Sequence, residues 1–308
     1  MIEIKNLTMQ YPNGKGIFDV DLNVGVGTAV GFLGPNGAGK TTTIRCLLGF
    51  MRGSEGTCTI NGQDCFDNAH RNMLDIGFIA GEPSFPDGMT GMEYLNFLCE
   101  IRKGSEAKLN RSSDPKDNSY AANMRNRMGE LIEYFEFDPK GKINRMSKGM
   151  KQKTAIVAAF MHDPNLLILD EPTSGLDPLM QNKFVDLLLR EKKKGKTILM
   201  SSHMFEEVER TCEQVVIIKD GRIVASDDVK NLKTSGTARF VVTSPQVAKI
   251  KLSFPTKKLD TDKIEATVPF DKVDKFIKEI AKYNITWLKT QEQSLENIFL
   301  DMYKKEGA

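Results

Sequence analysis

The stretch Gly34-Pro35-Asn36-Gly37-Ala38-Gly39-Lys40-Thr41 decides the fold of this chain. It fits the pattern Gly-x-x-x-x-Gly-Lys-Ser/Thr, which forms a loop around the phosphates of a nucleotide. Glycines let successive backbone N–H groups turn toward an anion, where larger side chains would be in the way. We therefore expect this loop, together with Thr42 directly after it, to bind nucleotide phosphates.

The flanking sequence supports this interpretation. Residues 29–33 are apolar and predict a short buried strand, and residues 42–51 carry apolar side chains at helical spacing. A strand, a loop and a helix in this order point the helix N-terminus at the phosphates. Lys40 can then reach the β- and γ-phosphates, and the Thr41 hydroxyl can ligate Mg²⁺.

A second segment carries complementary chemistry. The apolar run at residues 166–169 ends in the carboxylates of Asp170 and Glu171. Asp170 would hold the metal directly or through water, and Glu171 would polarise the water that attacks the γ-phosphate. Two acids after an apolar run are a weak signal alone, but together with a phosphate loop they predict an Mg-ATP site.

Composition limits the class of protein. The 308 residues allow one large and one small domain. The 43 Lys and Arg residues are nearly balanced by 41 Asp and Glu residues, so the net charge does not indicate binding to nucleic acid. No apolar run approaches the roughly 18–20 residues of a membrane span, and the N-terminus lacks a signal-peptide layout. The five cysteines are scattered without metal-ligand spacing, which predicts reduced thiols. We expect a soluble cytosolic protein.

Apolar patterning predicts an α/β fold around the two motifs. The expected elements are strands at residues 2–9, 17–24, 57–60, 166–169 and 197–200, a hairpin at 215–225, and helices from residue 90 and at 128–135, 154–162 and 180–194. The polar residues 103–123 predict a surface excursion or a partly disordered loop.

Composition changes near residue 228. Residues 229–236 predict a linker, and residues 237–308 a small α+β domain whose apolar stripes form its own core. Its expected elements are strands at 239–243, 263–268 and 285–290, a helix at 271–282, and a last helix capped by Ser294 that carries Leu295, Ile298, Phe299 and Met302.

Three further segments complete a pattern. Residues 146–152, Met-Ser-Lys-Gly-Met-Lys-Gln, resemble the ABC signature; residues 174–177 resemble the D-loop; and Ser201-Ser202-His203 matches the switch-histidine segment. In this order, with both nucleotide motifs, they make residues 1–228 resemble an ATP-binding cassette subunit. The resemblance implies a P-loop ABC ATPase core with an antiparallel β subdomain and a helical subdomain at about residues 83–160.

The resemblance also implies roles for single residues. Ser147 and Gly149 would contact the γ-phosphate held by an opposite cassette, so each ATP, with its Mg²⁺, lies between two chains. His203 would contact the γ-phosphate and support Glu171. Tyr11 occupies the place of the aromatic that stacks on adenine; alternatively it packs under a turn.

Two positions depart from the family pattern. Gly81 stands where the family usually has the glutamine that touches Mg²⁺ and the attacking water. Glu82 either replaces it or faces solvent. Lys148 occupies a glycine position of the signature, where it faces either the neighbour's nucleotide or outward.

The expected function is an ATP-hydrolysing subunit that powers an exporter of drugs, antibiotic peptides or lipid-linked polymers. Its implied partners are a separate transmembrane subunit and a second cassette, in a homodimer or heterodimer, which would hold it at the cytoplasmic face of the cell membrane. The alternative is a soluble ABC-type ATPase acting on a cytosolic macromolecular assembly.

Overall fold

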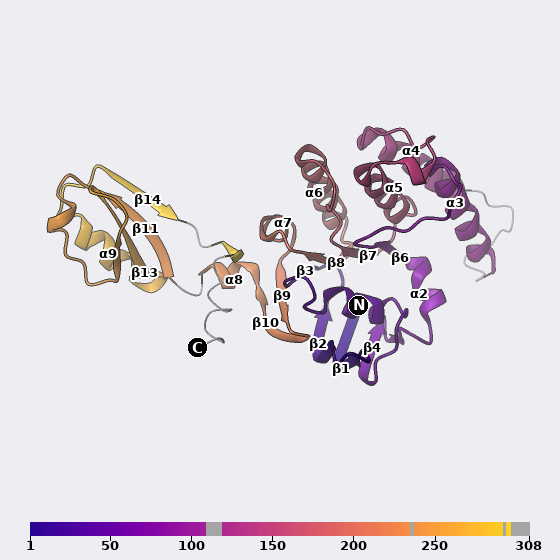
Figure 1. Ribbon diagram of the computed structural model, residues 1–308, viewed down its shortest axis with the longest axis horizontal. Helices are drawn as coiled ribbons and strands as arrows, with labels where there is room; N and C mark the ends of the chain where they lie inside the picture. Colours follow the sequence, from indigo (N-terminus) through magenta and orange to yellow (C-terminus); the bar gives the residue numbers. More distant parts are fainter. Residues whose placement is uncertain (109–118, 235–236, 292–293, 297–308) are drawn as a thin grey trace. The chain divides into compact units, whose positions relative to one another are not determined.

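The computed structural model describes residues 1–108, 119–234, 237–291 and 294–296. The chain divides into two compact units, Met1–Ser226 and Asp227–Ala308, which are described separately below (Figure 1). Ile298, Phe299 and Met302 of the expected last helix lie outside the described residues. No helix in the described part of the chain is both long and apolar enough to cross a membrane.

A six-stranded sheet forms the centre of the first unit, in the order β10-β9-β3-β8-β7-β6. β3 pairs in parallel with both β8 and β9, and β7 pairs in parallel with both β6 and β8. Every residue of β3, β7 and β8 is buried, as expected for parallel strands covered on both faces. The strands are β3 (Ala29–Leu33), β6 (Ile76–Ile79), β7 (Leu166–Asp170), β8 (Thr197–Ser202), β9 (Gln214–Lys219) and β10 (Arg222–Asp228).

Helices connect these strands. The sequence determines where α6 begins, because the Asp177 side chain accepts a hydrogen bond from Met180 N and a proline follows at the first helical position. The connecting helices are α1 (Lys40–Leu47), α2 (Ala69–Asp75), α6 (Pro178–Lys193) and α7 (Phe205–Thr211). Sequence patterning predicted α1 and α6 but missed the seven-residue helices α2 and α7.

A second, antiparallel sheet has the order β2-β1-β4-β5 and packs with α1 onto the central sheet. Asn61 and Gly62 form the predicted tight turn between β4 and β5, and both have the positive φ that such a turn needs, 53° and 75°. The strands are β1 (Ile2–Gln10), β2 (Gly16–Val24), β4 (Glu55–Ile60) and β5 (Gln63–Asp64). This sheet is the antiparallel β subdomain that the family resemblance implied.

Three helices, α3 (Gly91–Lys108), α4 (Ser119–Tyr134) and α5 (Lys148–Phe160), lie together in Figure 1, with a short 3₁₀ turn at Ile143–Arg145 before α5. Thr90 and Glu93 begin α3 with reciprocal hydrogen bonds between side chain and backbone. The expected loop at 103–123 was wrong at both ends, since α3 continues to Lys108 and α4 begins at Ser119. Because this segment is polar overall, the sequence did not reveal that α4 has a row of buried residues, which are Ala121, Met124, Met128 and Leu131.

The second unit contains a four-stranded sheet in the order β12-β13-β11-β14 and the helix α9. Phe276 of α9 packs against Phe240 of β11, with ring centroids 4.5 Å apart. Residues 229–234 of the expected linker form a helix, α8, in which Val229 and Leu232 are buried. The elements are α8 (Val229–Thr234), β11 (Thr237–Thr243), β12 (Thr256–Lys258), β13 (Lys263–Pro269), α9 (Val273–Ile280) and β14 (Trp287–Gln291), with 3₁₀ turns at Val247–Lys249 and Phe270–Lys272.

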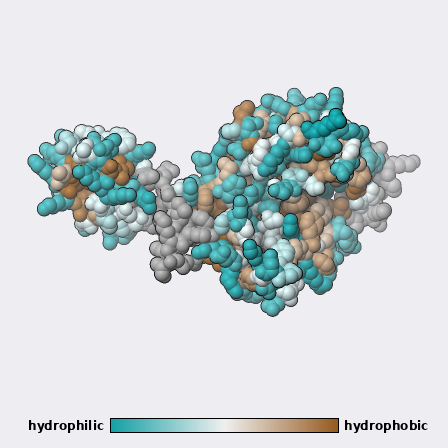
Figure 2. All heavy atoms as spheres, viewed as in Figure 1, coloured by the Kyte–Doolittle hydropathy of each residue, from teal (hydrophilic) through white to brown (hydrophobic). Residues whose placement is uncertain are grey.

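The surface is mainly hydrophilic on the face drawn in Figure 2, with hydrophobic residues in small groups between polar ones. Buried apolar side chains form a separate core in each unit. Among the described residues of the second unit, Phe240, Val242, Ala266 and Phe276 belong to such a core.

Candidate functional site

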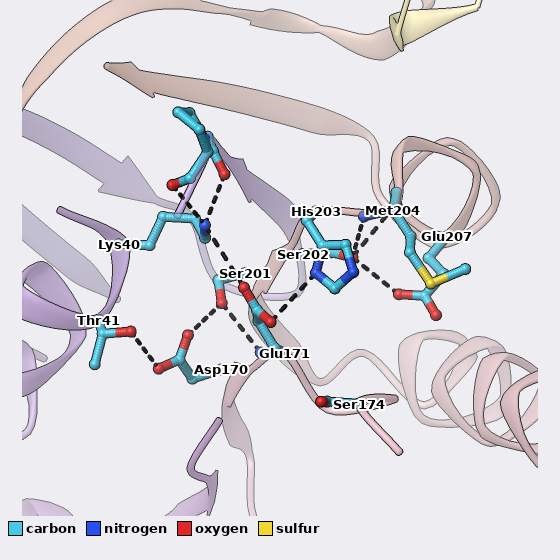
Figure 3. Close-up of polar contacts among 12 residues, drawn as sticks. Lys40, Thr41, Asp170, Glu171, Ser174, Ser201, Ser202, His203, Met204 and Glu207 are labelled. Atoms are coloured by element: carbon cyan, nitrogen blue, oxygen red, sulfur yellow. Dashed lines mark hydrogen bonds and ion pairs between the residues drawn. The ribbon is translucent and has the colours of Figure 1, made fainter. Parts of the chain in front are cut away.

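The candidate residues follow three neighbouring strands at the point where each strand ends (Figure 3). The loop at 34–41 follows β3, Asp170 ends β7 with Glu171 directly after it, and His203 follows β8. The carboxyl ends of parallel strands meet at one edge of a sheet, where open α/β sheets bind their ligands. The sheet therefore brings together residues that are up to about 170 positions apart in the sequence.

The loop between β3 and α1 depends on its glycines. Gly37 and Gly39 have positive φ, 81° and 115°, and a Cβ at Gly34 would lie 2.4 Å from the carbonyl oxygen of Ile218. Within the loop, Ala38 N donates to Pro35 O at 3.2 Å. Larger residues at these glycines would strain or displace the loop.

Lys40 is the first residue of α1, and its side chain is buried. Its ammonium group donates to the carbonyl oxygens of Gly34 at 2.6 Å and Pro35 at 3.2 Å, and it lies 3.6 Å from Glu171 Oε1. A buried ammonium group that is held next to the phosphate loop is suited to bind phosphate oxygens.

Thr41, Asp170 and Ser201 form a connected set of oxygen atoms. Thr41 Oγ1 donates to Asp170 Oδ2 at 2.8 Å, and Ser201 Oγ donates to Asp170 Oδ1. Mg²⁺ prefers oxygen ligands and commonly takes one or two carboxylates together with substrate phosphates. Among the described residues no cluster of three or more His, Cys, Asp and Glu could hold a metal by itself. The donor set thus fits Mg²⁺ bound with a nucleotide.

Glu171 has an unusual backbone. Its φ is 46°, in the left-handed region that few non-glycine residues adopt, and its N–H lies 3.1 Å from both the carbonyl and the hydroxyl oxygen of Ser201. Its carboxylate oxygens lie 3.6 Å from Lys40 Nζ and 3.2 Å from His203 Nδ1. Strained residues of this kind cluster at functional sites, where the surrounding structure holds them.

Ser202 and Glu207 form a buried hydrogen-bonded pair next to His203, and the sequence did not indicate this pair. Ser202 Oγ donates to Glu207 Oε2 at 3.0 Å and accepts from Met204 N at 2.9 Å, so it fixes the turn between β8 and α7. Burial raises the pKa of the Glu207 carboxyl. A glutamate near the start of a helix is too common to be recognised as part of a site from sequence alone.

A cavity of about 580 Å³ opens beside these residues. Gly81 and Glu82 line it together with Thr41, Asp170 and Glu171, and a Cβ at Gly81 would lie 3.5 Å from Asp170 Oδ2. The segment that departs from the family pattern therefore lies at the proposed metal site. The remaining lining residues are Asn36, Ile44, Arg45, Phe50, Phe78, Ala80, Lys148 and Ser174.

The signature segment lies at the N-terminus of α5. Ser147 caps this helix by accepting from Met150 N at 3.2 Å. The described residues that line the cavity include Lys148 but neither Ser147 nor Gly149. Lys148 Nζ donates to Ser174 Oγ at 3.0 Å, so this lysine contacts the 174–177 segment of its own chain.

Tyr11 lies in the turn between β1 and β2, with its hydroxyl 3.4 Å from Thr42 Oγ1 and 3.5 Å from Met51 Sδ. The ring thus lies beside α1, directly after the phosphate loop. Both interpretations of Tyr11, adenine stacking and packing under a turn, are compatible with this position.

Comparisons with known proteins agree with this geometry. The family model described as "ABC transporter" matches residues 17–174. An uncharacterized ABC transporter ATP-binding protein, YhcH of Bacillus subtilis, is 29% identical over 98% of this chain and 95% of its own length. The fluoroquinolones export ATP-binding protein MT2762 of Mycobacterium tuberculosis is 31% identical over 78% of this chain and 75% of its own. A solved structure of an ATP-binding subunit of an ABC transporter, 31% identical, covers 76% of this chain and 92% of its own with a TM-score of 0.66.

Proposed function

The chain belongs to the ABC transporter family of ATP-binding proteins, and we propose that it powers an exporter of drugs, antibiotic peptides or lipid-linked polymers. The family binds and hydrolyses ATP. Support for the export direction comes from the fluoroquinolone-export relative, which matches three quarters of both chains.

The phosphate loop and Lys40 bind the β- and γ-phosphates in this proposal. Lys40 exchanges its contacts with the Gly34 and Pro35 carbonyls for phosphate oxygens, which are stronger acceptors for a cation. Thr41 and Asp170 hold Mg²⁺, whose chemistry is to neutralise the charge of the β- and γ-phosphates. Ser201 keeps the Asp170 carboxylate in place.

Glu171 is the proposed general base. Its carboxylate is partly exposed, 24%, and lies between the ammonium of Lys40 and the imidazole of His203. It can therefore polarise a water near a γ-phosphate bound at Lys40. His203 orients this carboxylate through Nδ1, and Ser202 with Glu207 holds the turn that carries His203.

Ser147 and Gly149 are proposed to act on a second cassette. Ser147 is exposed at the N-terminus of a 13-residue helix, whose free N–H groups and dipole favour an anion. A γ-phosphate held by another copy or a related chain fits this end of α5. A separate transmembrane subunit then receives the motion and keeps the cassette at the cytoplasmic face of the membrane.

The observation that carries the proposal is the convergence of Lys40, Thr41, Asp170, Glu171 and His203 at one edge of the sheet. The test is purification of the tagged chain from its native membranes in mild detergent, followed by an ATPase assay. We expect a polytopic membrane protein in stoichiometric amount, and an ATPase activity that Lys40→Ala abolishes while the exposed-site control Glu206→Gln does not. Co-purification with a soluble assembly alone would contradict the transporter proposal.

A further inference from the structure

Two buried thiols lie in contact in the antiparallel sheet. The sulfur atoms of Cys58 and Cys65 are 3.2 Å apart, and both residues are free cysteines. Their exposed fractions are 8% and 1%. Neither residue lines the cavity of the nucleotide site, so the contact between the two thiols is not explained by nucleotide binding.

The hairpin register places these cysteines opposite each other. β4 and β5 pair Thr59 with Asp64 and Ile60 with Gln63, so the next pair outward is 58 with 65. Cys65 N donates to Cys58 O at 2.9 Å. In a hydrogen-bonded antiparallel pair the Cα atoms are about 5.5 Å apart. A disulfide spans Cα separations of about 4.4–6.8 Å, so the backbone can already accommodate one.

The surroundings favour a dithiol over a metal site. Cys46 of α1 lines the same cavity, about 90 Å³ in volume, as Cys58 and Cys65. Nevertheless, among the residues whose structure is described, no group of three or more His, Cys, Asp and Glu could hold a metal ion. The hydrogen bond to Cys65, followed by burial, raises the pKa of Cys58, and burial raises that of Cys46 to about 11. Cys58 and Cys46 therefore rest as neutral thiols.

Access to the buried pair requires local opening at β5. This strand has two residues and lies at the edge of its sheet, so it gains few contacts from its neighbours. Short edge elements open locally at a small free-energy cost. Opening of β5 would expose Cys65 without unfolding the central sheet.

We propose that Cys58 and Cys65 are a modification site, a dithiol that oxidises reversibly to an intramolecular disulfide joining β4 to β5. The Cys65 thiolate attacks a low-molecular-weight disulfide such as oxidised glutathione, forming a mixed disulfide and releasing one glutathione thiolate. Cys58 then loses its proton, and its sulfur displaces the second glutathione thiolate from the mixed disulfide. In all, two protein thiols are oxidised, two glutathione molecules are formed, and the protons pass to the released thiolates. This chemistry goes beyond ATP hydrolysis and does not rest on it.

The test incubates the full chain in buffers of rising oxidised-to-reduced glutathione ratio and maps disulfides by mass spectrometry of non-reduced peptides. We expect one disulfide, between Cys58 and Cys65, accompanied by the loss of two hydrogens and reversed by dithiothreitol. Cys58→Ser and Cys65→Ser abolish it. The matched control Cys212→Ser, which removes another buried free thiol, leaves it unchanged.

A separate control tests whether reagents reach the two thiols. N-ethylmaleimide labelling under the same conditions shows whether the thiols become exposed, and refolding from urea in the glutathione buffer removes the access barrier altogether. Labelling of both thiols without a disulfide between them would overturn the proposal. So would a disulfide of either residue with Cys46, or a refolded chain in which both thiols stay reduced.

Discussion

Lys148 Nζ donates a hydrogen bond to Ser174 Oγ at 3.0 Å, which joins the N-terminus of α5 to the segment directly after Glu171. The lysine stem also packs over Gly175, where a Cβ would lie 2.8 Å from Lys148 Cγ. Gln152 adds a third link, because its amide donates to Pro172 O at 2.6 Å. The signature lysine thus lies against its own chain, beside the segment that carries the proposed base.

Lys148 and Ser174 should act as one unit in ATP turnover. Lys148→Met keeps an apolar stem over Gly175 but removes the ammonium group, so we expect a several-fold loss of ATPase rate. Ser174→Ala should cost about the same, and the double variant no more than either, because groups that act together are not additive. Steady-state ATPase assays of the four chains measure this, with Lys151→Met as the control. Losses that multiply in the double variant would contradict the coupling.

Glu171→Gln should separate binding from turnover. The amide keeps the shape of the side chain but cannot accept a proton, so the rate should fall by about 10²-fold or more while ATP affinity is retained. Equilibrium ATP binding and single-turnover hydrolysis measure the two effects, and light scattering tests for trapped dimers. Turnover at the parent rate would refute the assignment of Glu171 as the base.

Ser147→Arg should block closure of two cassettes while leaving the affinity of the monomer for ATP nearly unchanged. Ser147 also caps α5, and removal of a cap typically costs about 1 kcal/mol of stability. Ser147→Ala is the comparison variant: it removes the cap and the proposed γ-phosphate contact but adds no bulk or charge, so it should weaken closure less than Ser147→Arg does. ATP-dependent dimerisation is measured by sedimentation. A large loss of ATP affinity in the monomer would count against a role on the second chain.

Glu82→Ala tests whether this exposed carboxylate takes the place of the family's glutamine. Glu82 lines the cavity that also contains Asp170 and Thr41, so we expect a lower ATPase rate and a higher Mg²⁺ requirement. The assay is ATPase rate against Mg²⁺ concentration, with Glu206→Gln as the control. An unchanged rate with unchanged Mg²⁺ dependence would show that Glu82 only faces solvent.

His162 should make the stability of the chain depend on pH. Its ring is buried, its Nε2 lies 3.2 Å from Ile76 O, and burial lowers its pKa from 6.5 to about 3. The unfolded chain therefore takes up a proton near pH 6.5 that the folded chain takes up only near pH 3. Stability is full above that range and falls as the pH drops through it, by up to about 1.4 kcal/mol per pH unit.

Urea denaturation between about pH 4 and about pH 8 measures this dependence. His162→Gln keeps an N–H donor for Ile76 O but does not titrate, so it should flatten this part of the curve. His70→Gln, at an exposed position, is the control. Parallel stability curves for the parent chain and His162→Gln would exclude the buried histidine as the cause.

Sequence patterns predicted the parts of the fold where apolar spacing or a glycine-containing turn acts locally. β3 and β7 are continuous apolar runs, and the Asn61-Gly62 turn was recognised from its two residues alone. α4 was placed too late because its first buried residues, Ala121 and Met124, lie among asparagines and a serine. α2 and α7 are too short to show a full helical period.

The candidate site was predictable where family motifs name the residues. Contacts that depend on strand order were not, because sequence spacing does not show which strands become neighbours. Ser201 reaches Asp170 because β8 lies next to β7, and Glu207 of α7 joins the site through hydrogen bonds with Ser202 and Thr173. The side on which Lys148 lies, which the sequence left open, likewise depends on the fold of the 171–176 segment.

The backbone of Glu171 implies a trade-off between stability and activity at this position. A left-handed φ of 46° suits glycine or asparagine better than glutamate, and such strain costs of the order of 1–3 kcal/mol. Variants selected for heat resistance alone should therefore accumulate Gly or Asn at position 171 and lose turnover. A library screened for both properties should keep glutamate there and gain its stability elsewhere.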